Sequence, residues 1–362
     1  MTTFEESGPR APVNISTRVD RIRPAARLGR TIQAIAVIIV MLIMLIPVMA
    51  MAVTAFKSRS AVVSIPPSLI PVKNGDVLRV EANDLWKETR QTSIARNFFS
   101  PTLEGFVFLL TDRAQAAPAR AEQLRALRDQ GNLGAFEQIA LNNGQEILGP
   151  SQYVFRLRNS LIIAGISTLA SVVLGLLAAY AFSRFNIHGE NDLLFFILST
   201  RMLPPVVVTI PLFLMYRQLG LHDTHIGMIL LYTVFNLSLS VWLLKGFIDE
   251  IPKEYEEAAL VDGYSRLQAF FRVVLPQAVT GIAATTVFCL IFAWNEYAFA
   301  LMLTSEKART APPAIVTMLG RGGIEWSAIA AGTLGFLIPV VIVTFALRNY
   351  LLRGVTFGAV RQ

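Results

Sequence analysis

Long apolar stretches, almost free of charged residues, alternate with polar segments along the 362-residue chain. A helix needs about 20 predominantly apolar residues to cross a hydrocarbon core of about 30 Å. The stretches that approach or exceed this length are residues 32–55, 159–182, 193–216, 226–244, 278–303 and 327–347. The pattern therefore predicts an all-α integral membrane protein with six transmembrane helices.

The first apolar stretch follows a polar, arginine-rich tail at residues 1–31. Ala50-Met51-Ala52 resembles a signal-peptidase site. However, the preceding apolar run exceeds the roughly 7–15 residues of a signal peptide's hydrophobic region, and it follows a long polar tail. We therefore expect residues 32–55 to be retained as the first transmembrane helix.

Residues 56–158 form a large polar insertion between the first and second predicted helices. Residues 113–141 within it are rich in Ala, Arg, Leu, Gln and Glu, which favour helix, and Gly131 and Gly134 predict a break. Nothing in the sequence indicates what this insertion does.

The distribution of Lys and Arg predicts the orientation of the helices. These residues recur in the tail at 1–31, in the loop at 245–277 and in the tail at 348–362, whereas the short loops on the other side hold few. The insertion is also basic, but it exceeds the length of about 60 residues within which the positive-inside rule operates. We therefore expect both termini and the 245–277 loop in the cytosol, and the insertion outside.

Composition adds three constraints. The net charge of +7 is scattered beside apolar stretches and forms no basic stripe, so nucleic acid is not an expected partner. The single cysteine, Cys289, lies in an apolar stretch and excludes an internal disulfide. His222 and His225 form an HxxH pair in a short loop, but without an accompanying carboxylate motif we expect no metal site.

Residues 254–276 form a polar hairpin between two apolar stretches. Acidic residues at its start favour a helix N-terminus, Gly263 predicts a left-handed stop, and Ser265 can cap a second helix. That helix has its apolar residues at helical spacing, which predicts one apolar face, and we expect Pro276 to end it; the face comprises Leu267, Phe270, Phe271 and Val274. From the pattern alone, the hairpin could equally be an amphipathic connector lying on lipid headgroups.

The spacing of this hairpin resembles a known signature. Glu257-Ala258-Ala259, then Gly263 after three residues, then Val273-Val274-Leu275-Pro276 after nine more, resembles the EAA loop of permease subunits of binding-protein-dependent ABC importers. Val273 stands where isoleucine is usual. Asp262-Gly263 and Trp294-Asn295-Glu296 are similar to the carbohydrate-type permeases, the group of the maltose transporter's G subunit.

The resemblance implies a multi-pass protein of the bacterial inner membrane, surrounded by lipid, which imports a sugar-like substrate. It also implies three protein partners: a second homologous permease subunit, a dimer of cytosolic ABC ATPases and an external solute-binding protein. No Walker A pattern occurs in the chain, so ATP and Mg²⁺ would bind to the ATPase and no cofactor to this chain. The residues expected to couple the ATPase to transport are Glu254, Glu257, Ala258, Ala259, Asp262, Gly263, Leu275 and Pro276.

Polar residues inside the predicted spans are candidates for the translocation path, because charge in a bilayer is costly and usually functional. They are Arg201, Asn236, Trp242, Asn295 and Glu296. Counted along straight helices, Arg201 lies nearer the cytosol and Glu296 nearer the outside, so we expect no pair between them. Arg201 could instead extend toward an interface, and the amides could simply join helices. Three prolines predict a kinked third span: Pro204, Pro205 and Pro211.

Small residues recur every fourth position in two spans, which lets membrane helices approach closely. They are Ser167, Ser171, Gly175 and Ala179 in the second span and Ser327, Ala331 and Gly335 in the sixth. Other functions remain open: an ABC permease for a non-sugar solute, an ATP-independent secondary transporter, or an external binding module anchored in the membrane.

Overall fold

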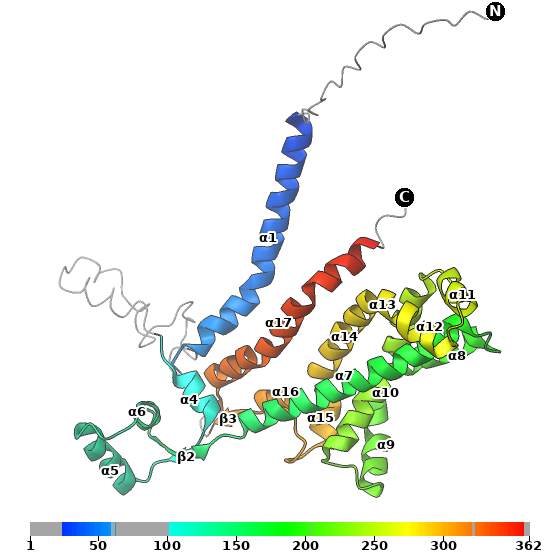
Figure 1. The fold of residues 1–362 in the computed structure, drawn as a ribbon. Coiled ribbons are helices and arrows are strands. Elements are labelled where there is room, and N and C mark those ends of the chain that lie inside the picture. Colours follow the sequence, from blue (N-terminus) through cyan, green and yellow to red (C-terminus); the bar gives the residue numbers. More distant parts are fainter. Residues whose placement is uncertain (1–23, 59–61, 63–100, 203, 321–322, 358–362) are drawn as a thin grey trace, which may run out of the picture. The chain divides into compact units, whose positions relative to one another are not determined.

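The computed structural model describes residues 24–58, 62, 101–202, 204–320 and 323–357 (Figure 1). The expectations for residues 1–23, for most of residues 56–100 and for residues 358–362 lie outside this part. The chain divides into two units, Met1–Met49 and Ala50–Gln362. The first unit holds most of α1 (Pro24–Ala55), whose segment Thr31–Ala55 is long and apolar enough to span a membrane.

Three further single helices within the described residues meet the same criterion, two of them in full: α7 (Tyr153–Arg184), α10 (His225–Asp249) and, within α17 (Trp326–Phe357), the segment Trp326–Arg348. Two other candidate spans are pairs of shorter helices separated by a sharp bend. The described residues therefore contain four helices that are long and apolar enough to cross a membrane, or up to six such spans if each bent pair counts as one. Each of the six predicted stretches overlaps one of these candidates.

The predicted third span is divided in the structure. It consists of α8 (Glu190–Ser199), a 3-10 turn η4 (Thr200–Met202) and α9 (Pro205–Gln218). Pro204 has extended dihedral angles of −60° and 130° and precedes Pro205. A residue before proline avoids helical angles, so the Pro-Pro pair separates the two helices. Pro211 lies within α9 without ending it.

The predicted continuous helix at residues 278–303 is also wrong. α14 ends at Trp294, and after a short break α15 spans Ala298–Leu303. The Glu296 carboxylate accepts hydrogen bonds from the backbone N–H groups of Phe299 (2.8 Å) and Ala300 (3.0 Å). This arrangement starts a new helix, because a carboxylate satisfies the free N–H groups of a helix N-terminus.

The core of the second unit forms around α7, which lies along α10 (Figure 1) and also packs on α14. All four small residues of the predicted α7 stripe are buried. A Cβ on Gly175 would come within 2.3 Å of the Ser240 Oγ atom in α10. The stripe therefore allows close helix packing, as the sequence predicts.

The insertion contains a β-hairpin that the sequence did not predict. Its described elements are α4 (Glu104–Leu110), β1 (Thr111–Gln115), α5 (Pro118–Asp129), α6 (Ala135–Asn142) and β2 (Gln145–Pro150). β1 and β2 are antiparallel, with Thr111 opposite Pro150 and Gln115 opposite Gln145. The helical expectation for residues 113–117 is thus wrong, because nonlocal pairing outweighs local helix propensity. The predicted break near Gly131 and Gly134 is present between α5 and α6.

The segment before α17 folds into α16 (Ala311–Val316) and two short paired strands, β3 (Leu319–Gly320) and β4 (Gly323–Ile324). α4 approaches the start of α17 very closely. A Cβ on Gly105 would lie 2.6 Å from the carbonyl oxygens of both Ala55 and Ser327. This contact requires glycine and fixes the insertion to the helical core of the second unit.

Candidate functional site

The hairpin between α10 and α14 is two helical segments joined by a tight turn. α11 spans Glu254–Val261, and the second segment comprises α12 (Arg266–Ala269), a π-helical turn η5 (Phe270–Val274) and α13 (Leu275–Gln277). Gly263 lies between them with φ +87°, a conformation that favours glycine. Ser265 and Gln268 form a capping box at α12. The predicted turn and cap are present, but the helix continues past Pro276 to Gln277.

The inner side of the hairpin is tied to the end of α7 by a buried ion pair. The Arg184 guanidinium donates to the Glu256 carboxylate, and their side chains are 5% and 9% exposed. Arg184 also donates to the backbone oxygen of Ile251 at 2.9 Å, and the Tyr180 hydroxyl donates to Glu256 at 3.0 Å. The sequence interpretation did not single out Glu256. Its position on the same helical face as buried Ala259 was the available signal.

The outer side of the hairpin combines acidic, small and apolar residues. Glu254, Glu257, Ala258, Asp262 and Pro276 are exposed, Leu275 is half-buried and Ala259 is buried. Four apolar side chains beside them are more than half exposed: Tyr255, Val261, Leu267 and Phe271. We call these four side chains the outer apolar surface. The predicted single apolar face is wrong, because Phe270 and Val274 point into the core whereas Leu267 and Phe271 do not.

Three of the five candidate path residues line one cavity of about 200 Å³. These are Arg201, Asn236 and Glu296. Arg201 and Glu296 therefore line the same cavity, which counting along straight helices did not suggest, because both predicted spans are broken. No ion pair joins them in the described residues. The guanidinium of Arg201 instead lies 4.1 Å from the centre of the Phe292 ring, a cation–π contact.

Each polar group of this cavity has a distinct environment. The Tyr232 hydroxyl donates to Glu296 at 2.7 Å, and Tyr232 is 3% exposed. Asn236 donates to the backbone oxygen of Cys289 at 3.0 Å and so joins α10 to α14. The Arg201 Nη1 atom is buried without a hydrogen-bond partner. Three phenylalanines complete the wall: Phe235, Phe292 and Phe299.

The other two candidates lie elsewhere. Asn295 is exposed and donates to the backbone oxygen of Ile291 in its own helix. Trp242 is 55% exposed and lines a separate cleft beside α8. The structure thus separates Asn295 and Trp242 from the cavity that holds Arg201 and Glu296.

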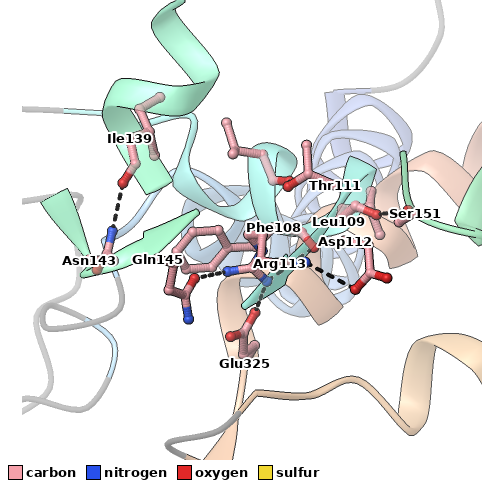
Figure 2. A network of polar contacts seen from close by, with 11 residues as sticks. Phe108, Leu109, Thr111, Asp112, Arg113, Ile139, Asn143, Gln145, Ser151 and Glu325 are labelled. Carbon is pink, nitrogen blue, oxygen red and sulfur yellow. Dashed lines mark hydrogen bonds and ion pairs between the residues drawn. The ribbon is translucent and has the colours of Figure 1, made fainter. Parts of the chain in front are cut away.

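A second, more polar cavity of about 560 Å³ lies where the β1–β2 hairpin meets the starts of α7 and α17. Figure 2 shows its central residue, Arg113, between Gln145 and Glu325. The Arg113–Glu325 ion pair is 2.7 Å long, with side chains 10% and 5% exposed. The guanidinium also lies 3.6 Å from the centre of the Phe108 ring. Sequence reasoning missed this cluster, because its members are far apart in the chain.

The histidines of the HxxH pair have separate partners. His225 Nε2 lies 2.9 Å from Asn159 Oδ1, and the His222 ring packs edge-on against Phe213. Among the described residues no group of three His, Cys, Asp or Glu side chains could hold a metal ion.

Asp223, between these histidines, has the left-handed φ of 56°. Its carboxylate accepts four backbone N–H groups from residues 305–308, at 3.0–3.2 Å. Burial raises the pKa of this carboxyl, but the four backbone hydrogen bonds outweigh that effect and the pKa lies below its ordinary value of 3.8. Asp223 thereby fixes the loop that follows α15.

Several known proteins are similar to this chain in sequence or in fold. Trehalose transport system permease protein SugB of Mycobacterium tuberculosis is 37% identical over 226 residues, which cover 62% of this chain and 82% of that protein. Inner membrane ABC transporter permease protein YcjP of Escherichia coli is 32% identical over 228 residues, covering 62% and 81%. A crystal structure of a bacterial ABC transporter that imports the acidic polysaccharide alginate contains a chain with TM-score 0.59 and 19% identity, covering 91% of this chain and 98% of that one.

The family profile described as "Binding-protein-dependent transport system inner membrane component" matches residues 171–357. This match extends from the middle of α7 through the hairpin and both bent pairs to the end of α17. It leaves out the insertion, including the polar cavity's Arg113 and Gln145. The chain therefore belongs to the family of inner membrane components of binding-protein-dependent transport systems.

Proposed function

We propose that this chain is a permease subunit of an ATP-driven ABC importer for a sugar, sugar derivative or polyol. Relatives at similar identity are named for trehalose, trehalose/maltose, and melibiose, raffinose and stachyose. Because the match to these relatives covers most of their length, we extend a saccharide substrate to this chain. The chain itself is non-catalytic in this proposal, and a separate ATPase binds ATP and Mg²⁺.

The observation that carries the proposal is the two-sided hairpin at residues 254–277. Its inner side is fixed to α7 through Glu256 and Arg184, and its outer apolar surface is left exposed beside Glu257. A rigid, partly apolar protrusion of this kind suits docking into a cleft of another protein. We place the ATPase on this surface, so that movement of the ATPase pair is passed to α7 and α10.

Alternating access follows from this arrangement. The hairpin is covalently continuous with α10 and α14, and Glu296 and Arg201 line a cavity beside both helices. Displacement of the hairpin would therefore change the packing around that cavity, which we assign to the translocation path. Its aromatic walls and few polar groups are suited to a saccharide, which has apolar ring faces and hydroxyl edges.

The proposed topology puts both termini and the hairpin in the cytosol, and the insertion outside, where a solute-binding protein delivers the substrate. A second homologous permease completes the path. The alternatives are an ABC permease for a non-sugar solute and, with less support, a secondary transporter, for which uptake would continue without ATP.

The test is co-expression with candidate ABC ATPases from the same organism, followed by affinity purification and uptake of labelled trehalose, maltose and raffinose. Leu267→Glu with Phe271→Glu should abolish ATPase co-purification and uptake. The matched control is Leu148→Glu, because Leu148 is a similarly exposed leucine (63%, against 67% for Leu267) far from the hairpin in the chain. Retention of the ATPase by the hairpin variant, or uptake that persists without ATP, would refute the coupling role. Uptake of none of the three saccharides would refute the substrate class.

A further inference from the structure

The polar cavity at the base of the insertion is not part of the proposed translocation site. It lies between the β1–β2 hairpin, the start of α7 and the α16–α17 segment. Its volume of about 560 Å³ falls within the range of about 300–1,000 Å³ typical of small-molecule sites. Eight polar side chains of its lining are Asp112, Arg113, Gln115, Gln145, Gln152, Arg156, Glu306 and Glu325.

Several of these groups are held in place without a ligand. Arg113 is fixed by Glu325, by the Gln145 side chain and by the Phe108 ring (Figure 2). Arg156 donates to Gln152 at 2.8 Å. Preorganised side chains of this kind lower the entropic cost of binding a ligand.

Three buried polar atoms of the lining nevertheless lack a hydrogen-bond partner: Arg113 Nε, Arg156 Nε and Glu325 Oε1. Buried polar atoms in proteins are nearly always paired, with protein or with water, so these three atoms favour a polar occupant of the cavity. Two of the atoms are donors and one is an acceptor. A hydroxyl group can serve both kinds, since it donates one hydrogen bond and accepts others.

The charged side chains of the lining indicate whether a bound molecule would be an anion, a cation or neutral. The lining includes two guanidinium groups, from Arg113 and Arg156, and three carboxylates, from Asp112, Glu306 and Glu325. An anion would meet the carboxylates and a cation the guanidinium groups, and neither would gain a large net attraction. A neutral molecule with several hydroxyl groups fits this balance better.

We propose that the cavity is a binding subsite for a neutral saccharide or polyol, separate from the cavity at Arg201 and Glu296. The choice of a saccharide rests on the proposed function. Arg113, Gln145 and Arg156 precede residue 171, where the family profile begins, whereas Glu306 and Glu325 lie within it, so the site is formed jointly by the insertion and the matched region. It would hold substrate beside α17 before or during transfer through the bundle.

The test is protection of an engineered thiol in the full-length, detergent-solubilised protein, where both membrane sides are accessible. Gln115→Cys places the thiol in the lining at an exposed position, and the natural Cys289 is fully buried and gives a low background. Trehalose, maltose or raffinose should slow maleimide labelling about tenfold at about ten times its Kd, because only unoccupied protein reacts. Gln130→Cys, exposed at the end of α5 and outside the lining, should be unaffected.

Adding Arg156→Gln to Gln115→Cys should remove the protection, because one guanidinium donor is lost. The inference is overturned if none of the three saccharides protects, if protection survives Arg156→Gln, or if galacturonate protects and the neutral saccharides do not. Saccharide uptake in cells is measured in a separate experiment from thiol protection. Uptake without protection overturns this inference alone, whereas protection without uptake overturns the proposed function alone.

Discussion

Glu256 in α11 and Arg184 at the last position of α7 form an ion pair in which both side chains are almost fully buried. Arg184 also donates to the backbone oxygens of Ile248 and Ile251, where α10 ends and the hairpin begins. One guanidinium thus joins three segments of the chain. The hairpin cannot shift relative to α7 without breaking this set of bonds.

Removing either partner of this pair should destabilise the hairpin. Arg184→Ala or Glu256→Ala leaves an uncompensated buried charge, which typically costs about 3–5 kcal/mol. We expect a lower thermal unfolding temperature of the purified protein and loss of ATP-driven uptake. Glu257→Ala is the control for stability, because Glu257 is exposed. Equal unfolding temperatures for Glu256→Ala and Glu257→Ala would contradict the anchoring role.

Gly263 should tolerate neither proline nor alanine without cost. Its φ of +87° is closed to proline, whose ring fixes φ near −65°, and alanine there is strained by about 1–2 kcal/mol. We expect Gly263→Pro to remain in the membrane and to separate ATP hydrolysis from uptake, both measured in proteoliposomes. Gly246→Ala, at a helical glycine with open space around it, should keep uptake. Full uptake by Gly263→Pro would argue against a coupling turn.

The α7–α10 contact should be sensitive to a single methyl group. Gly175→Ala forces a Cβ against Ser240, and overpacking of this kind costs about 1–3 kcal/mol. Gly165→Ala in the same helix meets no atom within 4 Å and should be neutral or stabilising. Thermal unfolding of the two variants in one detergent compares them directly. Because alanine favours helix more than glycine does, an equal loss of stability in Gly165→Ala would exclude the contact with Ser240 as the cause.

Glu296 should matter more than its neighbour Asn295. Glu296→Ala removes the cap of α15 and leaves the buried Tyr232 hydroxyl unpaired, which costs about 1–3 kcal/mol. We expect uptake and stability to fall together in this variant. Asn295→Ala removes one exposed hydrogen bond to the last turn of α14 and should change neither uptake nor stability measurably. If Asn295→Ala lowered uptake and stability more than Glu296→Ala did, Glu296 would not be part of the translocation path.

Asp223 predicts a pH dependence of stability. Its pKa is lower in the folded protein than the ordinary 3.8, so its contribution is fully present above that value and is lost as the pH falls through the lowered pKa. Asp223→Asn should therefore be less stable than the unchanged protein near neutral pH. The difference should shrink below about pH 4, where the unfolded carboxyl also begins to take up its proton. A difference that is constant down to the lowest accessible pH would exclude the carboxylate's charge as the cause.

The positions of apolar stretches were predictable because spanning a bilayer requires long apolar helices, which leave a clear pattern in the sequence. The hairpin turn at Gly263 and the cap at Ser265 were predictable for a similar reason, since both depend on local residue types. The breaks after Met202 and Trp294 depend on local chemistry too. The proline pair indicated the first, but the capping role of Glu296 was hidden inside an apolar stretch.

What could not be predicted depends on contacts between distant residues. Arg113 lies 212 positions from Glu325, and residues 113–115 have helical propensity although they pair with β2. The shared cavity of Arg201 and Glu296 was not predicted, because counting along straight helices ignores bends. Glu256 was overlooked as an anchor because its partners, Arg184 and Tyr180, lie more than 70 positions earlier.

The β1–β2 hairpin begins and ends at almost the same place. Thr111 lies opposite Pro150, and the Ser151 N–H donates to the Leu110 carbonyl at 2.8 Å. Evolution could therefore add, exchange or discard residues 111–150 as a unit, because the chain would still pass directly from the end of α4 to the start of α7. Transporters of one architecture could in this way acquire different outer attachments while their membrane machinery stays unaltered.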